Sequence, residues 1–106
     1  MKNNQFKKVI RKQIEWYCHQ NDLVSVFLDE TKNTRIFHFY DAFNWRWLGV
    51  VSVFINSDYV HLKFSNLKTL SLYQHIVKEV KADYKQFDKV MDTLGDIMEI
   101  IIKTEG

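Results

Sequence analysis

The hydrophobic periodicity of this chain changes twice, and these two changes constrain its fold more than any other feature. Apolar residues recur at helical spacing from Phe6 to Tyr17, and every second residue in much of the stretch from Leu23 to Phe64. They return to steps of three and four from Leu70 to Ile101. Helices and strands place side chains with these two different periods. The sequence therefore predicts an α+β protein with a helix, a block of strands and a second helical region.

The expected elements have definable bounds. An amphipathic helix is expected from about Asn4 to His19, followed by four strands joined by short polar turns. The expected strands are Leu23 to Leu28, Arg35 to Tyr40, about Trp45 to Ile55, and Tyr59 to Phe64. Short turns between successive strands predict a four-stranded antiparallel meander. In its last hairpin, Val51, Val53 and Ile55 are expected to face Val60, Leu62 and Phe64.

The C-terminal region allows two interpretations. One unbroken helix from Leu67 to Lys103 would be about 55 Å long. A domain of this length is only about 34 Å across, so such a helix would protrude and could form a homodimer through its apolar stripe. Alternatively, the helix breaks near Lys81 to Asp83, because Asp83 followed by Gln86 resembles a capping box. We favour the broken helix, packed on the sheet of the same chain.

Size and composition limit the class of protein. With 106 residues the chain is expected to form a single domain, residues 1–106. Its longest uninterrupted apolar stretch, Ile100 to Ile102, is far too short to cross a bilayer, and the lone Cys18 cannot form an internal disulfide. We therefore expect a cytoplasmic protein without a membrane partner. The absence of Pro and the abundance of Lys, Asn, Ile, Phe and Tyr are typical of an AT-rich genome.

No catalytic, metal or cofactor motif is recognisable. Cys18 and His19 are adjacent, and adjacent helical residues diverge by about 100°, so they cannot pair with each other. His38 and His61 lack a third metal ligand at a typical spacing. Glycine occurs only at positions 49, 95 and 106, which excludes a Gly-rich phosphate loop. We expect neither an enzyme nor a bound metal or cofactor.

The segment from Phe37 to Trp47 holds six aromatic residues in eleven. Alternation in a strand would put Trp45 and Trp47 on one face and Arg46 on the other. Because aromatic residues would then occupy both faces of the sheet, we expect some of them to be covered by a partner. The alternative is that the first helix covers one face of the sheet and the C-terminal helices cover the other.

Charge is distributed unevenly although the net charge is only +2. Asp88, Asp92, Asp96 and Glu99 follow one another at helical steps and predict an acidic ridge, a possible docking surface for a basic partner. Lys7, Lys8, Arg11 and Lys12 predict a basic arc on the first helix. Either charged face is also typical of an ordinary solvated helix surface.

Two functions are compatible with these patterns. The first is a small non-enzymatic protein that binds or occludes another protein, as inhibitors of host defence encoded by phages or mobile elements do. Its contact residues would be Phe43, Trp45, Arg46, Trp47, Asp88, Asp92 and Asp96. The alternative is a nucleic-acid-binding regulator that uses the basic arc, Lys7, Lys8, Arg11 and Lys12, together with Arg46. The small net charge favours the first.

Overall fold

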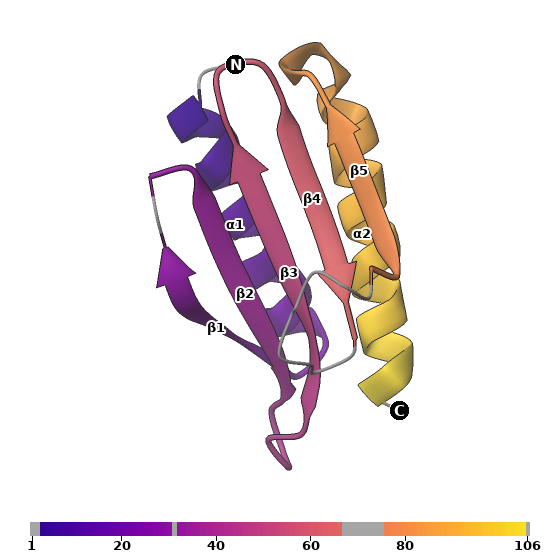
Figure 1. Cartoon of the computed structure of the whole chain (residues 1–106). Helices are drawn as coiled ribbons and strands as arrows, with labels where there is room; N and C mark the ends of the chain where they lie inside the picture. The colour runs from indigo at the N-terminus through magenta and orange to yellow at the C-terminus, as the bar shows by residue number, and fades with distance from the viewer. Residues whose placement is uncertain (1–2, 31, 67–75, 106) are drawn as a thin grey trace.

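The structure, a computed structural model, describes residues 3–30, 32–66 and 76–105. They form one five-stranded antiparallel sheet with two helices on the same side of it (Figure 1). The elements are α1 (Asn3–Gln20), β1 (Leu23–Glu30), β2 (Thr34–Asp41), β3 (Trp47–Ile55), β4 (Val60–Ser65), β5 (Lys78–Ala82), the 3-10 turn η1 (Tyr84–Gln86) and α2 (Phe87–Glu105). The predicted α+β class is confirmed.

The sheet is a meander, since its spatial order β1-β2-β3-β4-β5 is the order of the strands in the chain. In the hairpin of β3 and β4, Val51 pairs with Phe64, Val53 with Leu62 and Ile55 with Val60, as the alternation predicts. All six of these side chains are buried in the core. The alternation therefore predicted the pairing and the inner residues correctly, but Ser52, expected outside, is buried together with Val50 on the opposite face of β3.

A fifth strand replaces part of the predicted C-terminal helix. Lys78–Ala82 pairs with β4, with Val80 opposite Leu62 and Ala82 opposite Val60. Val80 and Ala82 are buried while Glu79 and Lys81 are exposed, which is the period of a strand. The helical prediction is wrong here because the free edge of β4 offers hydrogen-bond partners that local periodicity does not register. Leu70 and Tyr73, also assigned to that helix, lie outside the described residues.

The capping box at Asp83 is confirmed and marks the start of the C-terminal helical segment. The backbone N–H of Lys85 donates to Oδ1 of Asp83 at 2.8 Å, and the N–H of Asp83 donates to Oε1 of Gln86 at 3.3 Å. α2 then buries its apolar stripe in the core of the same chain, through Val90, Leu94, Ile97, Met98 and Ile101. The protruding helix that motivated a homodimer is therefore not formed.

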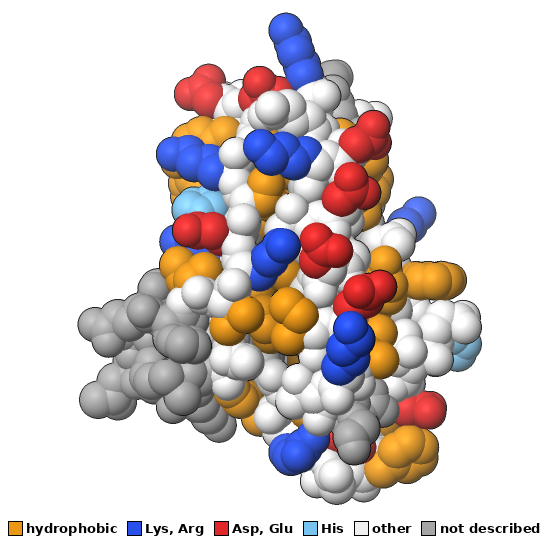
Figure 2. Space-filling view, turned by 90° about the vertical axis from the view of Figure 1, so that its right-hand side faces the viewer, with side chains coloured by type: hydrophobic (Ala, Val, Ile, Leu, Met, Phe, Trp, Pro, Cys, Tyr) orange, Lys and Arg blue, Asp and Glu red, His pale blue; other side chains and the backbone are white. Residues whose placement is uncertain are grey.

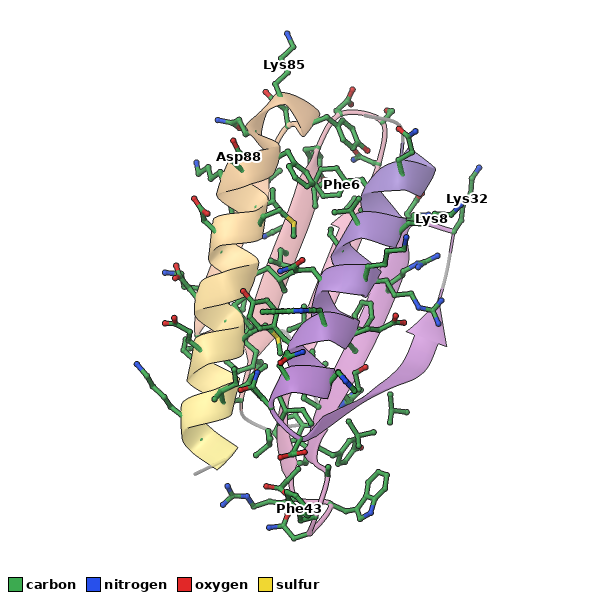
Figure 3. The ribbon with its side chains drawn as sticks, turned by 180° about the vertical axis from the view of Figure 1, so that it is seen from behind. Phe6, Lys8, Lys32, Phe43, Lys85 and Asp88 are labelled. Atoms are coloured by element: carbon green, nitrogen blue, oxygen red, sulfur yellow. The ribbon has the colours of Figure 1, made fainter. Side chains whose placement is uncertain are left out.

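Both helices pack against one face of the sheet, which we call the inner face (Figures 1 and 3). Phe6, Ile10 and Ile14 of α1 join the same core cluster as the stripe of α2. Gly95 allows the helices to approach, because a Cβ there would lie 3.3 Å from Oη of Tyr17. The alternative in which helices cover both faces is wrong for the described helices.

We expect Asp83→Ala to lower the free energy of unfolding by about 1 kcal/mol, because it removes the N-cap acceptor of the C-terminal helical segment. Urea denaturation followed by circular dichroism measures this. Lys85→Ala is the matched control, since it keeps the backbone N–H that donates to Asp83. Equal losses for the two variants would show that the cap contributes nothing.

Candidate functional site

The connection between β2 and β3 presents two large aromatic side chains to solvent. Phe43 is 78% exposed and Trp45 is 62% exposed. Figure 3 shows Phe43 beyond the end of the sheet, at one end of the molecule. We call Phe43 and Trp45 the aromatic tip. Two large apolar side chains exposed together on one turn mark a candidate interaction surface.

Asp41 organises the backbone of the aromatic tip. Its buried Oδ1 accepts the N–H of Phe43 at 2.8 Å and the N–H of Asn44 at 3.2 Å. Its carbonyl accepts the N–H of Trp45, and its own N–H donates to the carbonyl of Arg46, both at 2.9 Å. These bonds close the connection at its base, so the aromatic tip is carried on an ordered turn.

Trp45 has a left-handed backbone conformation, with φ of 59°. For a residue with a bulky side chain this conformation is unfavourable by roughly 1–2 kcal/mol. The conformation persists here because hydrogen bonds constrain the residues on both sides of Trp45. Asp41 accepts backbone N–H groups of the turn, and Oδ1 of Asn44 accepts the N–H of Arg46 at 2.8 Å. The strand predicted to begin near Trp45 therefore begins at Trp47, and Trp45 lies outside the alternation.

Arg46 links the turn to the end of α2. Its guanidinium Nη2 donates to the carbonyl oxygen of Thr104 at 2.6 Å. A cation in this position satisfies a carbonyl of the last helical turn and interacts favourably with the helix dipole. The guanidinium thus holds the turn against α2 in addition to any contact it makes with a partner.

Trp47 differs from Trp45 in its surroundings. It is half-buried in β3, and its indole Nε1 donates to Nδ1 of His38 at 3.0 Å on the outer face of the sheet, away from the helices. Trp45 and Trp47 nevertheless both border Tyr40. The ring centroids of Trp45 and Tyr40 are 6.2 Å apart, and Trp47 is the cross-strand partner of Tyr40. The aromatic tip thus continues onto the outer face.

The acidic ridge forms a second surface. Asp88, Asp92, Asp96 and Glu99 are all exposed, and Figure 2 shows acidic side chains in a row along α2. Nζ of Lys78 lies 3.5 Å from Oδ2 of Asp96, so β5 partly neutralises the row. Asp88 lies at the opposite end of the molecule from Phe43 (Figure 3). The predicted protein-contact residues therefore form two surfaces.

The basic arc lies far from the aromatic tip. Lys7 Nζ donates to the carbonyl of Lys32 at 2.7 Å, and Arg11 pairs with Glu15 at 3.0 Å, while Lys8 and Lys12 are exposed. Figure 3 places Lys8 and Lys32 at the end of the molecule opposite Phe43. Since Arg46 is beside the end of α2, the structure does not bring Arg46 together with the basic arc.

The remaining candidate groups have structural partners. His61 Nε2 lies 2.8 Å from Oε2 of Glu79, and His38 is the acceptor for Trp47. Among the described residues, no cluster of His, Cys, Asp or Glu could hold a metal ion, and no helix is long and apolar enough to cross a membrane. Burial raises the pKa of the Cys18 thiol to about 11, a shift that a hydrogen bond with Ser25 reduces and nearby Glu15 increases.

Two features of the site were not predicted. The role of Asp41 was missed, although an Asp just before a turn is a recognised signal for side-chain bonds to the following N–H groups. Trp16, which is 53% exposed on α1, was also missed. Trp16 provides a useful comparison for Trp45, because it is an exposed indole far along the chain from the aromatic tip.

We expect Asp41→Ala to lower the free energy of unfolding by about 1–3 kcal/mol, because the N–H groups of Phe43 and Asn44 lose their buried acceptor. Asp41→Asn keeps an acceptor oxygen and should lose much less. Urea denaturation measures the stability. Local order is measured by the fluorescence anisotropy of Trp45, in a variant in which Trp16 and Trp47 are replaced by Phe. An anisotropy unchanged in Asp41→Ala would contradict the organising role of Asp41.

The raised pKa of Cys18 also predicts a pH dependence. In the unfolded chain the thiol ionises near its ordinary pKa of 9.0, whereas in the folded protein it stays neutral up to about 11. Its contribution to stability is therefore fully present below about pH 9 and is lost as the pH rises through 11. The stability difference between wild type and Cys18→Ala, measured by urea denaturation from pH 8 to 10.5, should shrink as the pH rises. A constant difference would contradict this.

Comparison with protein-family models, curated proteins and solved structures gives no match to this chain. No role of a relative can therefore be transferred to the aromatic tip, the acidic ridge or the basic arc. The function has to be inferred from the residues of this chain themselves.

Proposed function

We propose that this chain is a small non-enzymatic protein-binding module that docks the aromatic tip into apolar pockets on another protein. The observation that carries the proposal is Trp45: a 62% exposed indole held in a left-handed backbone conformation on a turn closed by hydrogen bonds. Residues in unfavourable conformations persist where the surrounding structure constrains them, and they are concentrated at functional sites.

The ordered turn supports binding for a physical reason. An indole in solvent contributes little to folding, because it buries little apolar area. The same indole contributes strongly to an interface when it enters a pocket, and Trp, Tyr and Arg are the most frequent anchors of such interfaces. Asp41 fixes the turn before a partner arrives, so less conformational entropy is lost on binding.

The proposed mode of action is occlusion of a surface on the partner. Tyr40 and Trp47 extend the contact area from the tip onto the outer face, and Arg46 keeps the turn in position against α2. The acidic ridge would then serve as a separate docking surface for a basic region. The AT-rich composition supports a phage or mobile-element inhibitor as the biological setting of this proposal.

The alternative function, nucleic-acid binding by the basic arc with Arg46, has weaker support. Arg46 bonds to Thr104 at the end of α2, whereas Lys7 bonds to Lys32 at the opposite end of the molecule. A phosphate backbone in contact with the basic arc would therefore have to extend along the whole molecule to reach Arg46. The separation of these residues favours the protein-binding function.

We expect Trp45→Asn to abolish capture of the partner protein from a lysate of the host cells in which this chain acts, as judged by mass spectrometry of proteins retained on the immobilised chain. Asn tolerates the left-handed conformation, so the free energy of unfolding should change by less than about 1 kcal/mol. Trp16→Ala is the control, since it removes another exposed indole and should leave capture unchanged.

Two outcomes would contradict the proposal. In the first, Trp45→Asn and Trp16→Ala retain the same proteins in the same amounts as wild type. In the second, the immobilised chain retains only nucleic acid, with binding that weakens steeply with salt and is lost in Lys8→Glu combined with Arg11→Glu.

A further inference from the structure

The outer edge of β1 has hydrogen-bonding groups without a neighbouring strand in the described part of the chain. β1 and β5 are the two edges of the sheet. The N–H of Ala42 donates to the carbonyl of Asp22, so the pair of Asp22 and Ala42 is a hydrogen-bonded pair of the antiparallel ladder. Such pairs alternate along a ladder. Val24 and Val26 therefore bond to β2, whereas the backbone groups of Leu23, Ser25 and Phe27 point away from the sheet.

The two edges differ in how they are protected against a further strand. β5 carries Lys78, Glu79 and Lys81 within five residues, and charged side chains are a common protection of an edge. β1 has no charged residue and no Pro from Leu23 to Phe27, and its pairing with β2 stays regular over these residues. The pairing becomes irregular only between Phe27 and Asp29. An unprotected stretch of this kind is suitable for pairing with another strand.

The side of α1 next to this edge is positively charged. Cys18 of α1 bonds to Ser25 of β1, and Lys7 bonds to the carbonyl of Lys32 in the β1–β2 turn. Arg11 lies on the helix between these two contacts, and Lys8 follows Lys7. On the other side of the helix, Tyr17 lies against Gly95 of α2. We call Lys7, Lys8, Arg11 and Lys32 the cationic flank, and Figure 3 shows Lys8 beside Lys32.

We propose that the edge of β1 binds an extended segment of a partner protein with acidic side chains, which pairs with β1 as a sixth strand. Leu23, Ser25 and Phe27 supply the main-chain hydrogen bonds. Alternate side chains of an added strand point to the helix side of the sheet, where the cationic flank lies. Asp or Glu in the part of the added strand that extends past Phe27 toward Lys32 would therefore face Lys7, Lys8 and Arg11. This site uses none of the residues of the aromatic tip, although it begins beside the turn that carries the tip, where Leu23 pairs with Asp41.

The charge of the cationic flank favours an acidic segment over a second copy of this chain. In an antiparallel two-fold pairing of β1 with β1, each cationic flank would lie beside the segment from about Gln20 to Leu23 of the other copy, which carries a single carboxylate, Asp22. An acidic strand brings several carboxylates to the same place, and opposite charges favour association. Within the chain, Glu15 forms an exposed ion pair with Arg11, and β1 ends with Asp29 and Glu30, so Lys7, Lys8 and Lys32 are the cations expected to attract the strand.

The test uses the full chain and a fluorescein-labelled peptide of about nine residues in which Val and Glu alternate, long enough to span the regular part of β1. Binding is followed by fluorescence anisotropy. We expect Ser25→Pro to weaken binding about tenfold or more, because it removes one outward N–H and keeps the ladder with β2. Ser25→Ala is the matched control, since it removes only the hydroxyl that bonds to Cys18.

Hydrogen exchange provides a second readout that does not depend on a variant. In the free protein the N–H groups of Val24 and Val26 should be protected, and those of Ser25 and Phe27 should exchange quickly. The peptide should slow the exchange of Ser25 and Phe27.

Lys8→Glu with Arg11→Glu should weaken binding about tenfold and remove most of its salt dependence.

Several results would overturn the proposal. The first is that a peptide with Lys in place of each Glu binds as tightly as the acidic peptide. The second is that the acidic peptide does not bind, and the third is that it leaves the hydrogen exchange of the N–H groups of Ser25 and Phe27 unchanged. A dimer in light scattering that Ser25→Pro dissociates would assign the edge to a second copy, and displacement of the peptide by single-stranded DNA would assign the cationic flank to nucleic acid. Trp45→Asn should leave peptide binding unchanged, so the edge and the aromatic tip are tested independently.

Discussion

Both helices bury their apolar residues on the same face of the sheet, and the rest of the structure depends on this packing. Phe6, Ile10 and Ile14 of α1 and Leu94 and Ile97 of α2 share one core with the inner residues of the strands. The two helices leave the outer face to aromatic and polar side chains such as Tyr40, Trp47 and His61. α2 lies against the edge strand β5, whereas β1 extends beyond α1 at the other edge (Figure 3). The surfaces with proposed functions are those that this one-sided packing does not use.

The sequence was most informative where one face of an element is buried and the other is not. α1 follows this rule, and in the hairpin of β3 and β4 the alternation also identified the register and the inner residues, although Val50 and Ser52 on the opposite face of β3 are buried too. The capping box was predictable for a different reason, since Asp83 and Gln86 interact within a single turn. β5 was missed because Val77 and Val80 fit a helical step of three, whereas the buried pair of the strand is Val80 and Ala82. Only pairing with β4, which is remote in sequence, decides between the two.

The candidate site shows the same limit. Phe43 and Trp45 could be named from the density of aromatic residues, but the reason for their exposure lies in the turn that Asp41 organises. Alternation could not place Trp45, because its left-handed backbone interrupts the strand pattern. Arg46 was assigned to a binding surface by residue type, whereas its position is determined by a helix end that is distant in sequence. The hydrogen-bonding pattern at the edge of β1 likewise depends on strand order.

The aromatic tip and the cationic flank lie at opposite ends of a molecule whose longest dimension is 38 Å. The edge of β1 joins these two places, because Leu23 pairs with Asp41 at the base of the aromatic tip, so a strand bound along this edge would end next to a partner bound at the tip. If both ligands belong to one assembly, the first contact would raise the effective concentration of the second ligand near its own site. Two individually weak contacts could then hold this small chain firmly, and removal of either contact would release it.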